Sequence, residues 1–150
     1  MAVDLGVMMV PVVDRLPAGF DVLRPNAQAE GHRNVDRLAQ DWVGGAQRFD
    51  AAGEALLAAS IADVLAGVGG VTADPTLPGA VRMRRFYVQA VFRRHGVGRR
   101  LVETLIARVP PGVHLAVNAG TQQAARFWAA LGFTPDQRDG RTHTLPWRGG

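Results

Sequence analysis

The sequence predicts a single mixed α/β domain of the α+β kind that spans residues 1–150. Its 150 residues are 47% hydrophobic and 20% charged, which is enough apolar material for one buried core. Segments with the two-residue period of strands alternate with segments of helical period. The expected order along the chain is strand, helix, three strands, helix, strand, helix, strand.

The N-terminal third is predicted to hold one strand and one helix. Residues 1–15 form either an extra strand or a loose segment, and their apolar run is too short to span a bilayer. Residues 20–24 alternate like a half-buried strand that Pro25 would end. Residues 35–43 have apolar side chains at helical spacing, with Asn34 as the expected cap. We therefore expect a soluble, cytoplasmic protein.

Three strands are expected in the middle of the chain. Residues 53–61 and 64–72 are apolar, and the turn at 62–63 would join them as a hairpin. Residues 81–88 form the third strand, but the apolar positions change parity along it. Either the strand carries a β-bulge near Arg84 and Arg85, or it is regular with one polar residue facing inward.

The C-terminal third is predicted to contain two helices and two strands. Residues 97–109 carry one apolar stripe at helical spacing and are followed by a strand at 113–118. Thr121 is the expected N-cap of the next helix, and Gly132 follows its last turn in the place of a left-handed C-terminal glycine. The last strand is expected at 142–147.

The composition excludes several kinds of chemistry. All 17 basic residues are arginine, the chain has no cysteine, and Ser60 is the only serine. A lysine Schiff base, a thiolate nucleophile, a disulfide and a thiolate metal site are therefore impossible. The four histidines show no pairing at metal-ligand spacing, so no metal site is expected.

Positive charge is concentrated in one stretch. Residues 82–100 hold seven of the arginines and no acidic residue, although the net charge of the whole chain is only +4. Such a stretch suits a polyanionic partner, which could be a phosphate, a nucleotide or a nucleic acid.

The basic stretch ends in a strand, a glycine-bearing loop and the start of a helix. Gly96 and Gly98 permit close approach of a ligand to the backbone, and the first N–H groups of the helix have no intrahelical partner. Together with the helix dipole they form an anion site that fits a pyrophosphate. A Rossmann loop would need a third glycine where Leu101 stands, and a P-loop would need a lysine.

Two segments resemble the GNAT family of N-acetyltransferases. The run Arg93-Arg94-His95-Gly96-Val97-Gly98 matches the family's Arg/Gln-x-x-Gly-x-Gly/Ala loop, and residues 86–88 resemble the strand that precedes it. Residues 124–133 resemble the family's closing signature, Ala-x-x-Phe-Tyr-x-x-x-Gly-Phe. The resemblance covers residues 18–147 and implies a mixed, mostly antiparallel sheet, split at a bulged central strand and flanked by about four helices.

The resemblance also implies a ligand and its contacts. Acetyl-CoA would lie in the split of the sheet as the co-substrate, with its amides paired to the backbone of the central strand and its pyrophosphate on the loop. The residues implied in cofactor binding are Phe86, Tyr87, Val88, Arg93, Arg94, His95, Gly96, Val97, Gly98, Arg99, Asn118 and Phe127.

The sequence departs from the family at the position of its general acid. Trp128 stands where the family often has a tyrosine, and an indole N–H is not a useful acid. The candidate bases that could take a proton from the amine are Glu30, Glu54 and His143, with His32 beside Glu30.

Three functions remain open at this point. The first is transfer of an acetyl group to the amine of a small molecule or a protein N-terminus, in a protein that could form a homodimer. The second is a non-catalytic acetyl-CoA-binding module of the same fold, which the residue at Trp128 would suit. The third, binding of nucleic acid, is less favoured because the glycines suit a small pyrophosphate better.

Overall fold

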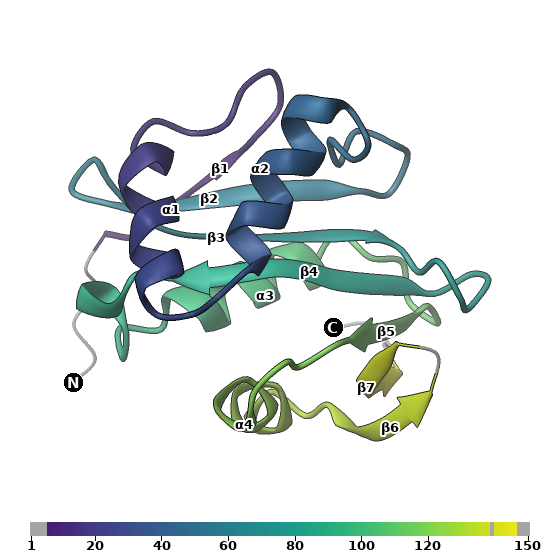
Figure 1. The fold of residues 1–150 in the computed structure, drawn as a ribbon. Helices are drawn as coiled ribbons and strands as arrows, with labels where there is room; N and C mark the ends of the chain where they lie inside the picture. Colours follow the sequence, from purple (N-terminus) through teal and green to yellow (C-terminus); the bar gives the residue numbers. More distant parts are fainter. Residues whose placement is uncertain (1–5, 139, 147–150) are drawn as a thin grey trace.

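The computed structural model describes residues 6–138 and 140–146, and Figure 1 shows its arrangement. Seven strands form one sheet in the order β1-β2-β3-β4-β5-β7-β6, in which only the β4–β5 pair is parallel. The strands are β1 (Met8–Pro11), β2 (Ala55–Ile61), β3 (Val64–Ala73), β4 (Val81–Val88), β5 (His114–Val117), β6 (Thr134–Arg138) and β7 (Arg141–Pro146). The described α-helices are α1 (Phe20–Ala29), α2 (Asn34–Gly44), α3 (Val97–Ile106) and α4 (Gln122–Ala130).

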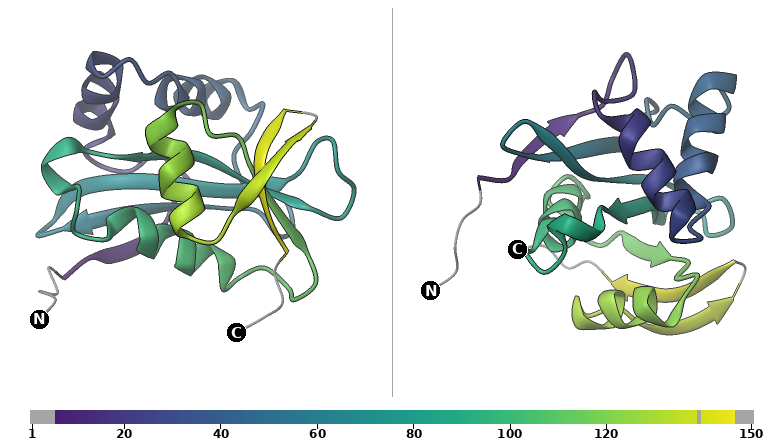
Figure 2. Two further views of the ribbon diagram at one scale, coloured as in Figure 1. Left: turned by 90° about the horizontal axis from the view of Figure 1, so that it is seen from below. Right: turned by 60° about the vertical axis from the view of Figure 1, so that its left-hand side comes forward.

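The helices cover the sheet from both sides (Figure 2). Leu56 and Ala58 of β2 pack under α1 and α2, whereas Leu57 and Ala59 pack in the core that contains α3. Successive strand residues face opposite sides, so a strand covered on both sides is apolar throughout. This explains why β2 and β3 show no alternation in the sequence. The predicted fold class, a mixed and mostly antiparallel sheet with four helices, is confirmed.

The strand predicted at 20–24 is wrong, because these residues begin α1. Phe20, Leu23 and Ala27 are buried and lie three and four positions apart, which is the spacing of one helix face. Five residues of alternating pattern are too few to separate the two periods. Pro25 does not end the segment either, since it lies inside the helix.

Of the two alternatives for the strand at 81–88, the structure shows the β-bulge, in β4. Its pairing with β3 shifts between Val68 and Gly70, and Arg85 has a left-handed φ of 62°. As a result Met83 and Phe86, three residues apart, pack in the same core with α3. The change of parity in the sequence therefore records a real irregularity of the strand.

The helix ends are only partly as expected. Thr121 Oγ1 accepts a hydrogen bond from the Ala124 N–H, and Gly132 has a φ of 96°, so both predicted ends of α4 are confirmed. Asn34 does not cap α2: it is the first helical residue, and Arg33 precedes it as the cap.

Three further differences concern the strands and the ends of the chain. Residues 134–138 are polar and show no apolar pattern that predicts a strand, but they form β6. The expected N-terminal strand exists as β1, although residues 1–5 lie outside the described part, as does Trp147 of the last strand. No helix in the described ranges is long and apolar enough to cross a membrane.

Candidate active site

The centre of the sheet opens along β4. β5 pairs with β4 only from Val81 to Met83, so the second half of β4 has a neighbouring strand only on its β3 side. Two backbone carbonyls of this half accept hydrogen bonds from side chains. Asn34 Nδ2 donates to the Phe86 oxygen over 2.6 Å, and Arg93 Nε donates to the Val88 oxygen over 3.0 Å. The opening therefore exposes backbone that can bind a ligand with amide groups.

The loop after β4 brings the N-terminus of α3 to this opening. Arg94 and Gly96 both have left-handed φ angles, of 67° and 78°, and turn the chain into the helix. No side chain caps α3, so its first N–H groups point out of the helix without a partner from a cap. Arg94, His95 and Arg99 are exposed around them. This is an environment that favours an anion.

Gly98 lies where the helix meets two other elements. A Cβ atom at Gly98 would lie 3.1 Å from the Phe127 ring and 3.7 Å from Val88 Cγ2. A glycine here thus allows α3, α4 and β4 to meet closely, which brings three residues of the predicted site together.

A polar network joins Arg93 to the segment between α1 and α2. Both terminal nitrogens of Arg93 donate to the Glu30 carboxylate over 2.7 Å, and the Tyr87 hydroxyl donates to the same carboxylate. The Arg93 guanidinium also lies 5.6 Å from the Tyr87 ring centroid, and the His32 ring packs edge-on against Tyr87. In this structure the Arg93 side chain is therefore directed at Glu30 and not at the N-terminus of α3.

The network changes two pKa values. Hydrogen bonds from Arg93 lower the pKa of Glu30, even though partial burial acts in the opposite direction. Burial, followed by the Glu30 carboxylate, raises the pKa of Tyr87 to about 12. At neutral pH the network therefore contains an ionised Glu30 and a neutral tyrosine.

Trp128 lies in an aromatic cluster. Its ring is buried and meets Phe86, Phe127 and Phe133 edge-on, with centroid distances of 5.0 to 5.1 Å. The position that holds the family's tyrosine is thus filled by a packed apolar side chain.

His143 lies at the point where the opening begins. It pairs with Val117, and Val117 pairs with Met83, which is the last residue of β4 joined to β5. His143 is buried, and its Nδ1 lies 2.8 Å from Thr142 Oγ1. That hydroxyl also accepts a hydrogen bond from the Ala119 N–H, one residue beyond the exposed Asn118.

Glu54 lies away from the opening. Its two oxygens accept hydrogen bonds from the Ala51 and Ala73 N–H groups, and Ala73 pairs with Val81 at the start of β4. Since a strand rises about 3.3 Å per residue, roughly 20 Å separate Val81 from Val88. The structure brings Glu30 and His143 to the opening from different elements and leaves Glu54 at the far end of β4.

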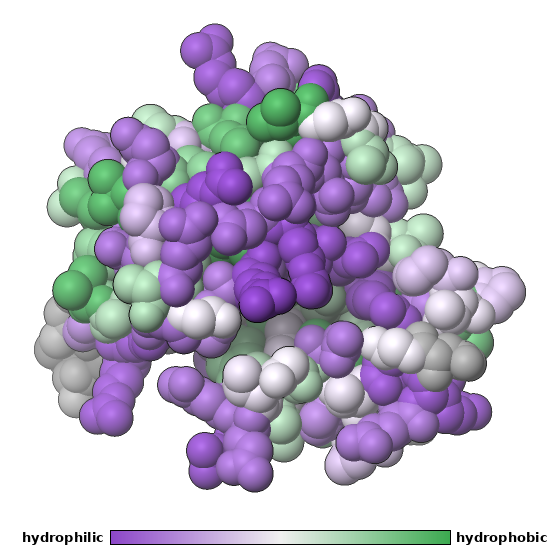
Figure 3. All heavy atoms as spheres, viewed as in Figure 1, coloured by the Kyte–Doolittle hydropathy of each residue, from purple (hydrophilic) through white to green (hydrophobic). Residues whose placement is uncertain are grey.

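The arginines of the basic stretch at 82–100 are distributed over β4, the loop that follows it and the start of α3. Figure 3 shows hydrophilic side chains gathered over β4 below α2. Arg82 pairs with Asp74, Arg85 with Asp41 and Arg93 with Glu30, so three of the seven arginines are matched by acidic residues from other elements. The charge that is left for an external anion is therefore smaller than the sequence indicates.

One residue of the site was missed by sequence reasoning. Asn34 Oδ1 is buried without a hydrogen-bond partner, while its Nδ2 binds the carbonyl of Phe86. The only signal in the sequence is the position of Asn34 just before a helical pattern. That position predicts an N-cap and not a hydrogen bond to the Phe86 carbonyl of β4. Within the described ranges, no three acidic or histidine side chains gather as a metal site.

Comparison with known proteins identifies the family. Residues 24–147 match the model of the acetyltransferase (GNAT) domain, and no curated protein matches the chain. A proposed acetyltransferase from Exiguobacterium sp. 255-15 is 26% identical, with 93% of each chain covered and a TM-score of 0.82.

Two more distant structures share the fold. A proposed GNAT-family acetyltransferase from Desulfovibrio desulfuricans is 20% identical over 94% of this chain and 99% of its own, with a TM-score of 0.69. A proposed acetyltransferase from Salmonella typhimurium, solved with its cofactor acetyl-CoA, is 15% identical over 93% of each chain, with a TM-score of 0.63. With the open β4 edge, the uncapped α3 and a family model that covers most of the sequence, this chain belongs to the GNAT acetyltransferase family.

Proposed function

We propose that this protein is an acetyl-CoA-dependent N-acetyltransferase that acts on the amine of a small molecule or a protein N-terminus. The observation that carries the proposal is the opening of β4 next to the uncapped N-terminus of α3. The open edge of β4 can pair with the amides of an extended ligand, and the N-terminus of α3 can bind the pyrophosphate of that ligand. The Salmonella typhimurium relative, which shares this fold, binds acetyl-CoA.

The residues of this chain fit such a ligand. The carbonyls of Phe86 and Val88 already accept one hydrogen bond each, but a carbonyl oxygen has a second lone pair. Arg94, His95, Gly96, Val97, Gly98 and Arg99 would surround the phosphates, and Asn118 and Phe127 would border the same groove. Tyr87, on the other face of β4, would act only through Glu30 and Arg93.

The reaction would be direct attack of a neutral amine on the thioester that acetyl-CoA supplies. The amine nitrogen bonds to the acetyl carbon, the carbon–sulfur bond breaks, and the electron pair leaves with the sulfur as a thiolate. Backbone N–H groups near Val88 would stabilise the negative oxygen of the transition state. Trp128 is packed against other aromatic rings and does not supply an acid. A water molecule would therefore protonate the thiolate, or the thiolate would leave unprotonated.

His143 is the first candidate base for the ammonium proton. It lies level with Met83, five residues along β4 from Val88, so it would take the proton through water molecules. Glu30 remains a second candidate, although a carboxylate whose pKa is lowered by Arg93 is a weaker base. Glu54, held by two backbone N–H groups at the far end of β4, is the weakest candidate.

The test begins with binding. Acetyl-CoA is expected to raise the melting temperature of the full chain, and Gly98→Glu is expected to remove the rise by filling the space at Phe127. Gly44→Ala, at a glycine with open space around it, is the matched control. A melting temperature that does not change with acetyl-CoA at millimolar concentration would contradict the proposal.

Catalysis is tested on the same protein with a panel of amines and detection of the released thiol. His143→Asn is expected to lower kcat, whereas Glu54→Gln leaves it unchanged. If Glu30→Gln and not His143→Asn lowers kcat, the assignment of the base moves to Glu30.

A non-catalytic acetyl-CoA-binding module is the second candidate, and the apolar cluster around Trp128 is the observation that favours it. It predicts a thermal shift with acetyl-CoA but no transfer to any amine, and no gain of activity in Trp128→Tyr. Since acetyl-CoA is a cytoplasmic metabolite, both candidates imply action in the cytoplasm.

A further inference from the structure

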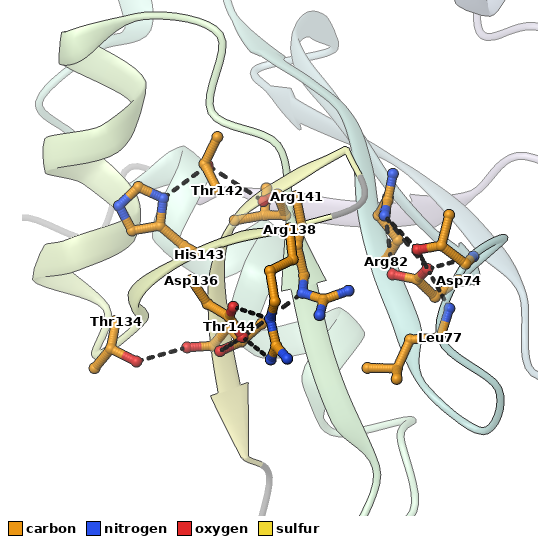
Figure 4. A network of polar contacts seen from close by, with 12 residues as sticks. Asp74, Leu77, Arg82, Thr134, Asp136, Arg138, Arg141, Thr142, His143 and Thr144 are labelled. Atoms are coloured by element: carbon orange, nitrogen blue, oxygen red, sulfur yellow. Dashed lines mark hydrogen bonds and ion pairs between the residues drawn. The ribbon is translucent and has the colours of Figure 1, made fainter.

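A shallow cavity of about 390 Å³, widely open to solvent, lies between the end of β5 and the described residues where β6 and β7 meet. Its described lining residues are Asn118, Gln137, Arg138, Gly140, Arg141 and Thr142. Figure 4 shows the polar side chains of this region, with Asp136, Arg138 and Arg141 directed at one another.

Arg141 is the unusual member of this lining. Its side chain is 3% exposed, and its buried Nε and Nη1 atoms have no hydrogen-bond partner among the residues that the structure describes. The carboxylate oxygen of Asp136 lies 3.6 Å from Nε, which is an ion-pair distance but too long for a hydrogen bond. A guanidinium group has five N–H donors, and burial without partners is costly for a charged group.

Asp136 is already engaged by another arginine. Arg138 donates to both of its oxygens, from Nε over 2.7 Å and from Nη2 over 2.9 Å, and the Thr144 hydroxyl lies 3.4 Å from one of them. Within residues 6–138 and 140–146, the exposed Arg138 thus has the short hydrogen bonds to Asp136, while the buried Arg141 has a long contact to it. A second negative group beside Arg141 would balance the charge that Asp136 leaves incompletely compensated.

The cavity adjoins the opening of the sheet. Asn118 directly follows Val117, which is the last residue of β5 that pairs with β4. Thr142 accepts a hydrogen bond from the Ala119 N–H and contacts His143 Nδ1. Arg141 and His143 are two positions apart on β7 and so lie on the same face of the sheet. A molecule with an amine near His143 could place a second group in the cavity.

Resting on the proposed function, we infer that this cavity binds the negatively charged group of the acceptor, and that Arg141 is the residue that selects it. The acceptor is then an amine that also carries a carboxylate or a phosphate, with Asn118 and Gln137 as neutral hydrogen-bonding neighbours. Arg141 is a specificity residue and takes no part in proton transfer. The N-terminus of α3, proposed above to bind the pyrophosphate, is a separate anion site at the other end of the opening along β4.

The test compares acceptors that differ only in charge. Acetyl transfer is measured for free amino acids against their carboxamides, and for phosphoethanolamine against ethanolamine, with saturating acetyl-CoA. For at least one pair, the charged acceptor is expected to have a kcat/KM at least tenfold higher than that of its neutral counterpart, because its KM is lower. The pair that shows the preference identifies the group as carboxylate or phosphate. Equal rates within both pairs would overturn the inference.

Variants assign the preference to Arg141. Arg141→Gln is expected to abolish it and Arg141→Lys to restore part of it, whereas Arg108→Gln, at an exposed position outside the cavity lining, keeps it. The thermal shift with acetyl-CoA should be unchanged in all three variants, which shows that they fold and bind the co-substrate. If Arg141→Gln retains the preference, Arg141 only stabilises the hairpin and the inference fails.

A binding experiment decides the inference even if no amine is acetylated. Acetate and inorganic phosphate are added separately to the wild type, Arg141→Gln and Arg108→Gln, and melting temperatures are compared. The α3 N-terminus is present in all three, so only a stabilisation that is lost specifically in Arg141→Gln supports the site. An equal rise in all three proteins, or no rise in any, overturns it.

Discussion

Arg93 and Glu30 form an ion pair with two hydrogen bonds of 2.7 Å between residues 63 positions apart in the chain. The pair ties the loop that leads into α3 to the segment between α1 and α2. Because Arg93 also donates to the Val88 carbonyl, one side chain joins the glycine loop, the open edge of β4 and the helical layer above it. Two predictions follow from this contact.

Tyr87 should titrate late. It is the only tyrosine, so the near-ultraviolet absorbance of phenolate reports on it alone. Burial and the Glu30 carboxylate raise its pKa to about 12, and Glu30→Gln should bring the midpoint closer to the ordinary value of 10. Because the folded value is raised, the stability linked to this group is present below pH 10 and falls as the pH rises towards 12. A midpoint that does not differ between wild type and Glu30→Gln would show that the two groups do not interact.

The Arg93–Glu30 pair should contribute little stability, and only above acidic pH. Both side chains are about one-third exposed, so Glu30→Gln is expected to lower the free energy of unfolding by no more than about 1 kcal/mol. Since the pKa of Glu30 is lowered from 4.5, this contribution is present above pH 4.5 and is lost as the pH falls further. Urea unfolding at several pH values measures the difference. The exposed Glu103, mutated to Gln, is the control and should show a smaller effect.

Asp74 and Arg82 should matter far more for stability. The Asp74 side chain is fully buried, and it accepts hydrogen bonds from the Thr76 and Leu77 N–H groups and from Arg82. Burial acts to raise the pKa of Asp74, but these partners outweigh it and lower the pKa. Asp74→Ala removes the carboxylate that neutralises the buried Arg82 guanidinium and should cost about 3 kcal/mol of unfolding free energy.

Chemical denaturation checks this value. Asp50→Ala, at an exposed position, is the control and should change the unfolding free energy by less than about 0.5 kcal/mol. Similar losses in both variants would mean that the Asp74–Arg82 pair is not a special contributor. The stability that ionised Asp74 provides is present above its ordinary pKa of 3.8 and is lost in acid.

Trp128 should be a stability determinant whatever its role in chemistry. Trp128→Ala removes a buried ring that contacts three other aromatic rings and should cost about 3 to 5 kcal/mol. Trp128→Phe keeps most of the contacts and should cost less than half as much. Denaturant midpoints give both values, and a small loss in Trp128→Ala would indicate that the cluster is loosely packed.

Much of this fold could be predicted because its signals are local. The bulge of β4 is visible as a change of parity, the cap of α4 as Thr121, and the end of α4 as Gly132, since each depends on a few neighbouring residues. The segment at 20–24 failed because a five-residue window fits both periods, and the helical face becomes clear only when Ala27 is included. β6 lacks an apolar face and forms because β7 offers it a partner.

The resemblance to the family, the order of most elements and the loop at 93–98 could be recognised before the structure was known. The resemblance depends on two short motifs, and the elements and the loop depend on periodicity and on the positions of glycine. Which charged residues form ion pairs with one another depends on the tertiary structure. Glu30 and Arg93 are far apart in the chain, as are Arg85 and Asp41, and nothing local indicates that they pair. The tertiary structure also decided that Arg141 is buried with an incomplete set of partners, since burial depends on how the β6–β7 turn packs against the rest of the sheet.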